Sequence, residues 1–274
     1  MRVIELSNHP ELMREQAYRQ RLTTEQAAKK DYEAAASQHR ASVASIRQER
    51  DAALTGFRWW RSIPLTFALW KAQLLEAPLR PTRPAGNANL EASLTAGMEG
   101  EQLVAAQLGR NLGNEWTLFR GYKNRGGEID HILLGPRGLV AIEVKHRNAT
   151  VHCDGSSWWY DKYDKYGNHV GRGELTDRRG RSPSEQLNEP ADLLENFLQE
   201  RGHGLLVQRV VLLTHRKSRV GSCHNVAVQL IATSTDYILD LLNELPPTVT
   251  TEQSRAIEQL VVRDHDFHES HRRR

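Results

Sequence analysis

Hydrophobic residues in the second half of the chain fall into short runs separated by turn residues, and one pair of runs predicts a β-hairpin. Residues 128–134 and 139–145 are largely apolar, and the sequence Gly-Pro-Arg-Gly at residues 135–138 lies between them. Gly and Pro in such a position are typical of a tight turn. We therefore expect an antiparallel pair of strands over residues 128–145.

The pattern elsewhere predicts a mixture of helices and strands. Residues 161–182, charged and rich in Gly, predict an exposed loop, and residues 264–274, rich in His and Arg, predict a disordered tail. We expect helices at 94–112, from Pro183, at 234–242 and at 251–262, and strands at 116–120, within 149–160, at 205–213 and at 226–231. This order is typical of an α/β fold with a mixed central β-sheet flanked by helices. An α-helical N-terminal arm, described next, precedes this fold in the chain.

The N-terminal arm is predicted to be one long helix. Residues 11–54 are rich in Ala, Gln, Glu and Arg and contain no Gly or Pro. A heptad register from Tyr18 to Ala53 places apolar residues or Ala at most of its seam positions. This is a weak coiled-coil signal. A homo-oligomer formed through residues 11–54 and a helix folded back onto the domain are both open.

Composition changes between these regions and suggests domain boundaries. Residues 78–90 are rich in Pro and Gly, which indicates a linker. We predict a helical arm at 1–77, the linker at 78–90, an α/β domain at 91–245, and a C-terminal helix with a basic, His-rich tail at 246–274. Basic residues exceed acidic ones before residue 91, while the rest of the chain is slightly acidic.

The overall composition excludes several classes of protein. Charged residues make up 26% and hydrophobic residues 39%, as in soluble globular proteins. Two cysteines are too few for a disulfide framework. The apolar segment 57–70 contains two arginines and a proline and is too short to cross a bilayer. We expect a cytoplasmic protein without a membrane span.

The predicted hairpin brings charged residues together at one end. Asp130 opens its first strand and Glu143 closes the second, so an antiparallel pair sets the two carboxylates side by side. Side chains alternate along a strand, so Lys145 points to the same face as Glu143. Two carboxylates and an ammonium suit a divalent cation and an activated water. An ordinary salt bridge at the mouth of a hairpin is the alternative.

Four short motifs follow one another along the chain. They are Gly-Met-Glu-Gly-Glu at 97–101, Gly-Glu-Ile-Asp at 127–130, Ile-Glu-Val-Lys at 142–145 and Ser-Pro-Ser-Glu-Gln at 182–186. Together they resemble the NERD (nuclease-related domain) family of the PD-(D/E)XK nuclease superfamily. The resemblance covers roughly residues 94–240, and the N-terminal arm lies outside it.

The resemblance implies a metal-dependent hydrolysis of phosphodiester bonds. Asp130 and Glu143 would bind Mg²⁺ or Mn²⁺, and Glu101 would reach the metal directly or through water. Lys145 would orient or help deprotonate the attacking water, or stabilise charge on the phosphate. Gln186 would hydrogen-bond the water shell of the metal or the substrate backbone, or only cap its helix.

Basic loops near the strand ends are the candidates for contact with nucleic acid, with DNA as the expected ligand. They are Lys123 and Arg125, and the run Arg178, Arg179 and Arg181, for which a solvated loop is the alternative. Rings that could stack on bases are Trp158, Trp159, Tyr160, Tyr163 and Tyr166. For the tryptophans a hydrophobic edge is the alternative, and we expect at least one of them to pack in the core. Two other functions are open: a catalytically silent nucleic-acid-binding module, and a scaffold protein that acts through its helical arm.

Overall fold

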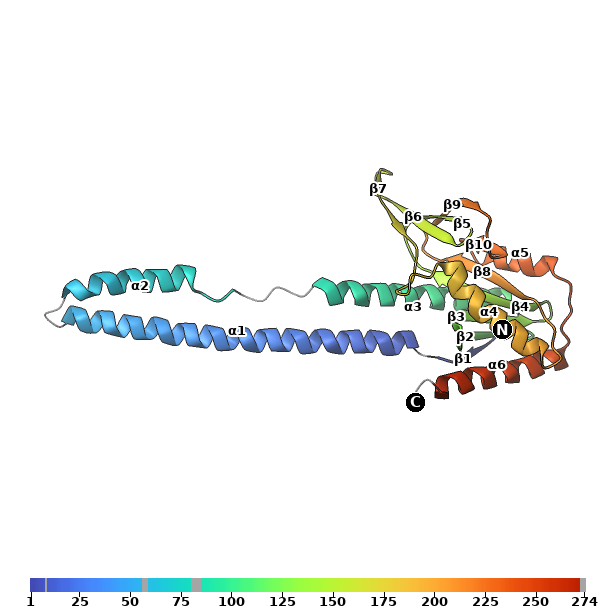
Figure 1. The fold of residues 1–274 in the computed structure, drawn as a ribbon, viewed down its shortest axis with the longest axis horizontal. Coiled ribbons are helices and arrows are strands. Elements are labelled where there is room, and N and C mark those ends of the chain that lie inside the picture. Colours follow the sequence, from blue (N-terminus) through green and yellow to red (C-terminus); the bar gives the residue numbers. More distant parts are fainter. Residues whose placement is uncertain (8, 56–58, 80–84, 272–274) are drawn as a thin grey trace. The chain divides into compact units, whose positions relative to one another are not determined.

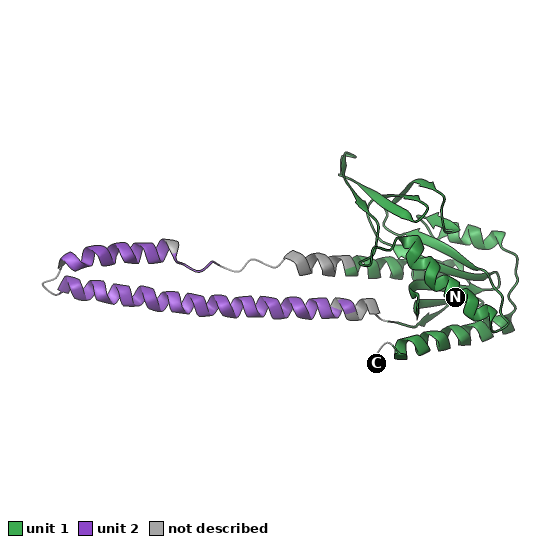
Figure 2. Cartoon of the chain, viewed as in Figure 1, with its two compact units in different colours: residues 1–12, 93–274 green, residues 13–92 purple. Residues whose placement is uncertain are grey.

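A computed structural model describes residues 1–7, 9–55, 59–79 and 85–271 (Figure 1). The chain divides into two compact units (Figure 2). Unit 1 contains residues 1–12 and the chain from residue 93 onward, and unit 2 contains residues 13–92. Among the described residues, no helix combines the length and the apolar character needed to cross a membrane.

A six-stranded sheet forms the centre of unit 1. Its strands follow the order β1 (Arg2–Glu5), β2 (Thr117–Asn124), β3 (Gly127–Gly135), β4 (Gly138–Lys145), β8 (Val207–Leu213) and β10 (Leu230–Ala232). β3 pairs antiparallel with β2 and β4, while β1, β8 and β10 join the sheet through parallel pairs. The predicted mixed sheet is therefore confirmed.

Helices cover both faces of this sheet. They are α3 (Ala85–Asn111), α4 (Pro183–Gln199), α5 (Asp236–Glu244) and α6 (Thr251–His271). Phe119 and Ile132 pack into one buried cluster with residues of α4 and α6. Leu118 and Leu133, their neighbours along the same strands, pack into a second cluster with α3 and α5. Alternate residues of each strand thus face opposite helical layers.

The predicted hairpin is formed by β3 and β4. Gly135 pairs with Gly138, so the turn consists of two residues, Pro136 and Arg137. Gly138 has a φ of 119°, in the region that favours glycine. The ladder continues to the pair of His131 with Ile142. The next positions in the same register are Asp130 and Glu143.

A second sheet of four strands extends from the first. Its order is β7 (His169–Glu174), β6 (Ser157–Tyr163), β5 (Thr150–Asp154) and β9 (Arg219–His224). β5 follows β4 along the chain, and β9 follows β8. The predicted loop at 161–182 was wrong over residues 161–163, which belong to β6, and over β7, and β9 was not predicted. Both strands are mostly polar and alternate between exposed and half-buried residues, so they carry no hydrophobic pattern.

The two ends of unit 1 also differ from the prediction. Residues 2–5 form β1 instead of belonging to a helical arm. α6 continues to His271, so the predicted disorder of residues 264–271 was wrong; residues 272–274 lie outside the described residues. The helix extends because Asp264 accepts a hydrogen bond from Tyr122 and the buried ring of His265 accepts one from the backbone N–H of Lys123.

The predicted linker is partly helical. α3 begins at Ala85, so residues 85–90 belong to a helix. Residues 80–84 of the same predicted linker lie outside the described residues.

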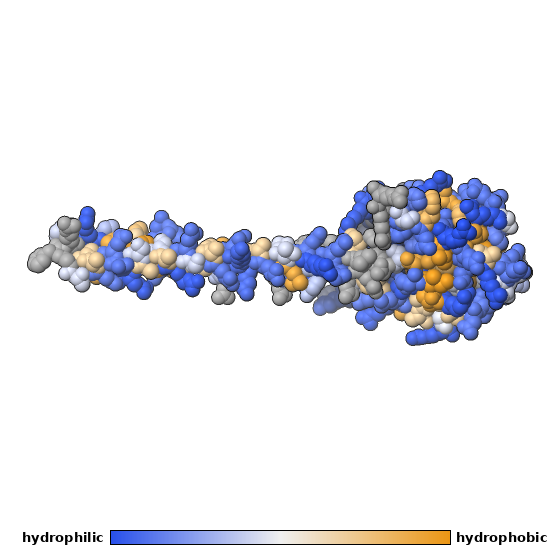
Figure 3. Space-filling view, turned by 90° about the horizontal axis from the view of Figure 1, so that it is seen from below, coloured by the Kyte–Doolittle hydropathy of each residue, from blue (hydrophilic) through white to orange (hydrophobic). Residues whose placement is uncertain are grey.

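Unit 2 confirms the long helix of the N-terminal arm. It contains α1 (His9–Thr55) from residue 13 onward, a short 3-10 turn (Trp59–Arg61) and α2 (Ser62–Leu75). The ring of His39 on α1 shares a hydrogen bond of 2.9 Å with the carbonyl oxygen of Ala72, which places α2 beside α1. The visible face of this unit is mainly hydrophilic, with scattered apolar residues (Figure 3). Self-association through residues 11–54 stays a prediction.

Candidate functional site

Asp130 and Glu143 lie at the open end of the β3–β4 hairpin. The Oδ2 atom of Asp130 accepts a hydrogen bond of 2.7 Å from the backbone N–H of Val144, and this contact ties the carboxylate to the neighbouring strand. The side chain of Glu143 is only 6% exposed. Two acids from adjacent strands are thus held close together where water has little access.

The carboxyl groups of this region disfavour one another's ionisation. Burial raises the pKa of Asp130 well above its usual range, and the charges of Glu143 and Glu101 raise it further. Burial likewise raises the pKa of Glu101 to about 7, against the opposing effect of Arg120. Because negative charge is costly here, the region favours a bound proton or cation.

Lys145 supplies a positive charge at the same strand end. Its Nζ donates hydrogen bonds to Glu143 Oε1 at 2.6 Å and to Gln186 Oε1 at 3.0 Å. Burial alone would lower the pKa of Lys145, but the charges of Glu143 and Asp130 outweigh it and hold the pKa above its usual value. Lys145 is therefore a charged hydrogen-bond donor at neutral pH.

Glu101 reaches the region from α3. Its Oε2 lies 3.8 Å from a guanidinium nitrogen of Arg120, and Arg120 also donates to Glu5 of β1 at 3.0 Å. The side chain of Glu101 is 17% exposed. The edge strand β1 and α3 thus place two acids on either side of one arginine.

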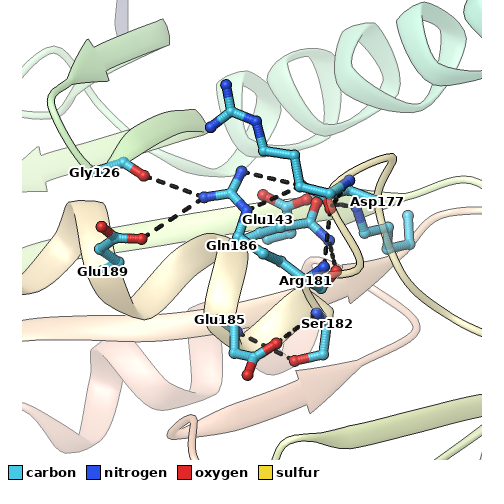
Figure 4. A network of polar contacts seen from close by, with 10 residues as sticks. Gly126, Glu143, Asp177, Arg181, Ser182, Glu185, Gln186 and Glu189 are labelled. Carbon is cyan, nitrogen blue, oxygen red and sulfur yellow. Dashed lines mark hydrogen bonds and ion pairs between the residues drawn. The ribbon is translucent and has the colours of Figure 1, made fainter.

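Gln186 is fixed by the start of α4. Ser182 caps this helix and forms a capping box with Glu185, and Pro183 opens the first turn. Gln186 Nε2 donates to the carbonyl oxygen of Arg181 at 2.8 Å, while its Oε1 accepts from Lys145. The motif at 182–186 therefore holds the amide between Lys145 and the preceding loop (Figure 4).

Two of the predicted nucleic-acid contacts face protein groups instead of solvent. Arg181 donates to Asp177 at 3.0 Å and to the carbonyl oxygen of Gly126 at 3.1 Å (Figure 4). Lys123 is only 4% exposed, and its Nζ lies 3.6 Å from Glu128 and 3.7 Å from Glu269. The charge of each is already opposed by carboxylates, which sequence proximity alone did not indicate.

The other three predicted contacts are exposed. Arg178 and Arg179 lie in the loop before α4, and Arg125 lies in the turn between β2 and β3. Arg125 also lines an open groove along α4 together with Asn188 and Asp192. These three guanidinium groups are accessible to a ligand.

The donor atoms at this strand end suit a hard cation, although a complete set is not assembled. Asp130 and Glu143 offer carboxylate oxygens, the donors that Mg²⁺ and Mn²⁺ prefer. Across the described ranges, no three His, Cys, Asp or Glu side chains form a group that could hold a metal ion. Glu101, the predicted third acid, faces Arg120 instead. Two acids therefore fit the ion directly, and a third oxygen would have to come from elsewhere.

Sequence reasoning missed a second group of cations. Arg216 and Lys217 lie in the connection between β8 and β9, Arg219 is the first residue of β9, and all three are exposed. Three cations within four residues, immediately after an apolar strand, are a signal that the sequence did contain.

Comparison with protein families found a match to NERD, the nuclease-related domain, over residues 96–214. This segment contains Glu101, Asp130, Glu143, Lys145 and Gln186. Comparisons with curated proteins and with solved structures gave no match. The match confirms the resemblance on which the site was predicted: residues 96–214 of this chain are similar to the nuclease-related domain family.

Proposed function

We propose that this protein is a metal-dependent nuclease that hydrolyses phosphodiester bonds of nucleic acid, with DNA as the preferred substrate. One observation carries the proposal: the side chains of Asp130, Glu143 and Lys145 gather at one strand end inside the segment that matches the nuclease-related family.

Asp130 and Glu143 would bind the cation, Mg²⁺ or Mn²⁺, through carboxylate oxygens. When bound, such an ion acts as a Lewis acid toward the phosphate and lowers the pKa of a coordinated water. The hydrogen bond from the Val144 N–H fixes the Asp130 carboxylate, so one of its oxygens is already oriented. Burial and then the charges of Glu143 and Glu101 raise the pKa of Asp130, and a bound cation would offset both effects.

Lys145 would act as a donor and not as a base. Since its pKa is raised, its amino group carries a proton at neutral pH and cannot accept another. It would stabilise negative charge that develops on the phosphate during attack. Gln186 holds Lys145 in place from α4, and we assign it a positioning role. Of the roles expected for Lys145, stabilisation of the phosphate is thus the one we propose.

Glu101 would contribute through a bridging water, because its carboxylate is paired with Arg120. The exposed Arg125, Arg178 and Arg179 would contact the nucleic-acid backbone. Lys123 and Arg181, whose charges are opposed by carboxylates, would shape the loops that carry those arginines.

The direct test is cleavage by the purified full-length chain. Labelled single-stranded DNA, duplex DNA and RNA are incubated with Mg²⁺, Mn²⁺ or EDTA. We expect metal-dependent cleavage that Asp130→Asn abolishes and that the matched surface variant Asp240→Asn retains. Equal cleavage by the wild type and Asp130→Asn would assign the activity to a contaminant and end the proposal.

One observation favours the silent binding module as a second candidate. Glu143 is bonded to Lys145, and Glu101 is paired with Arg120, so these two acids have cationic partners without a metal. Nucleic-acid binding without cleavage in any of the divalent metals would support this candidate over the nuclease.

A further inference from the structure

The connections that follow β4 and β8 are joined to each other directly beyond Lys145. The backbone N–H of Thr214 donates to the carbonyl oxygen of Lys145 at 3.1 Å. Further along, the Ser218 hydroxyl donates to the Arg147 carbonyl oxygen at 2.5 Å, and the Arg219 N–H donates to the Ala149 carbonyl oxygen at 3.1 Å. The basic segment 216–219 is therefore held beside the chain that leaves the candidate site.

A hollow of about 920 Å³ lies between these connections and the turn joining β6 to β7. We call it the basic hollow. Its charged and aromatic lining consists of Tyr163, Asp164, Lys165, Arg216, Lys217 and Arg219. Asn148, three residues after Lys145, lines it too. Three residues span at most about 11 Å, so the hollow begins within that reach of Lys145.

The positive charges of the basic hollow are not compensated by the protein. Lys165, Arg216, Lys217 and Arg219 are exposed, and within the described ranges no carboxylate lies within ion-pair distance of them. The acid of the lining, Asp164, accepts hydrogen bonds from the N–H groups of Tyr166 and Asn168 and is used by its own turn. An anionic ligand would supply the missing charge.

Exposed rings lie beside these cations. Tyr163 lines the hollow and is 45% exposed, and Tyr166 at the adjoining turn is 77% exposed. The Lys165 ammonium lies 4.8 Å from the centroid of the Tyr166 ring. A cationic groove with accessible aromatic rings is how proteins hold nucleic-acid strands whose bases are unpaired, because the backbone meets the charges and the bases stack on the rings.

We infer that the basic hollow binds the phosphate backbone of a single nucleic-acid strand, with Tyr163 and Tyr166 stacking on its unpaired bases. The inference rests on the proposed function for the class of ligand, and it extends that function by naming single strands and the surface that holds them. A strand seated in the hollow would continue past Lys145 toward Asp130 and Glu143.

Binding without cleavage tests the inference. The full-length protein in EDTA is titrated against a fluorescent oligothymidylate, and anisotropy is followed over a series of salt concentrations. The test variant is R216A/K217A/R219A. The control R110A/R255A/R263A removes the same number of exposed arginine or lysine charges from α3 and α6.

We expect the test variant to bind at least tenfold more weakly. Its slope of log Kd against log salt should fall by about 2, since each lost phosphate contact on a single strand accounts for about 0.7. The control variant should stay within twofold of the wild type. Equal weakening by both variants, or an unchanged salt slope in the test variant with an unchanged melting curve, would overturn the inference.

Tyr166→Ala tests the stacking on its own. It should weaken binding of the oligothymidylate several-fold and leave binding of an abasic strand of equal length unchanged. Tighter binding of a duplex than of the single strand would overturn the assignment to unpaired bases. An oligouridylate measured in parallel distinguishes RNA from DNA as the source of the same backbone chemistry.

The two proposals fail separately. If the protein cleaves nucleic acid but R216A/K217A/R219A binds the oligothymidylate as tightly as the wild type, the basic hollow is refuted as a binding site and the nuclease proposal stands. Binding that depends on these cations, with no cleavage in Mg²⁺ or Mn²⁺, removes the nuclease and leaves the hollow.

Discussion

Cations occur in two regions of unit 1, and they differ in what faces them. At the end of the β3–β4 hairpin, Lys145 lies 2.6 Å from Glu143, and Lys123 and Arg181 also face carboxylates within 4 Å. In the basic hollow, Arg216 and Lys217 have no such partner within the described ranges. The cations of the first region are thus already paired with acids of the protein, whereas those of the second are available to a ligand. Whether a cation can bind a ligand therefore depends less on its charge than on whether a carboxylate of the protein already lies next to it.

The largest effect should come from the acidic strand end. Asp130→Asn keeps the size of the side chain and removes its charge, so we expect cleavage to fall about a thousandfold, at the upper end of the range seen when a charge-stabilising group is lost. Binding of the oligothymidylate in EDTA should change less than threefold, because the hollow is untouched. Initial cleavage rates and anisotropy measure the two quantities. A parallel loss of both would erase the distinction between the two regions.

Lys145→Met should reduce turnover about a hundredfold while Mn²⁺ still binds. The methionine has a side chain of similar length without the charge that would stabilise the phosphate. The substitution also frees Glu143 for the metal. Calorimetric titration with Mn²⁺ and single-turnover cleavage separate the two effects. Loss of Mn²⁺ binding together with a lowered melting temperature would make Lys145 a structural residue.

The pH dependence of stability should report Glu101. Its pKa is raised to about 7 from an ordinary value of 4.5, so the folded protein binds this proton more tightly than the unfolded chain. The stabilisation is complete below pH 4.5 and is lost as the pH rises toward 7, by about 3 kcal/mol at most. Urea denaturation in EDTA at several pH values, compared with Glu101→Gln, isolates this contribution. If the difference in unfolding free energy between the wild type and Glu101→Gln stays constant across this pH range, the contribution assigned to Glu101 is wrong.

The smallest effects should distinguish two cations, Lys123 and Arg125, that the sequence predicted to contact nucleic acid. Lys123→Ala should destabilise the fold by about 1–2 kcal/mol, because it removes a buried ammonium group that lies 3.6 Å from Glu128 and 3.7 Å from Glu269, and it should leave the Kd for DNA within twofold. Arg125→Ala should do the reverse, with little change in stability and weaker binding. Urea denaturation measures the stability of both variants, and anisotropy measures their Kd for DNA. Weaker DNA binding by Lys123→Ala at unchanged stability would show that Lys123 contacts DNA.

Local patterns predicted the parts of the fold that depend on local interactions. The hairpin followed from two apolar runs around a Gly-Pro-Arg-Gly turn, and the start of α4 followed from Pro183 and the residues that cap it. The closeness of Asp130, Glu143 and Lys145 followed from strand alternation and the register of one hairpin. These features need only contacts between residues near each other in sequence.

Long-range pairing was beyond the same reasoning. Lys123 was expected on the surface because Glu269, on α6, is remote in sequence. Arg120 was not recognised as the partner of Glu101 and Glu5, which come from two other elements. β7 and β9 escaped notice because polar strands at a sheet edge carry no period-2 apolar signal.

The pairing of β1 with β2 has a practical consequence for isolating the nuclease-related region. Because β1 precedes α1 in the chain, unit 2 is an insertion between this strand and the remainder of unit 1. Starting an expression clone near residue 93 would discard β1 and leave unpaired the backbone N–H and C=O groups of β2 that face β1, an edge that invites aggregation. An internal deletion that replaces residues 13–92 with a short Gly/Ser bridge would retain the strand and yield the better-behaved fragment.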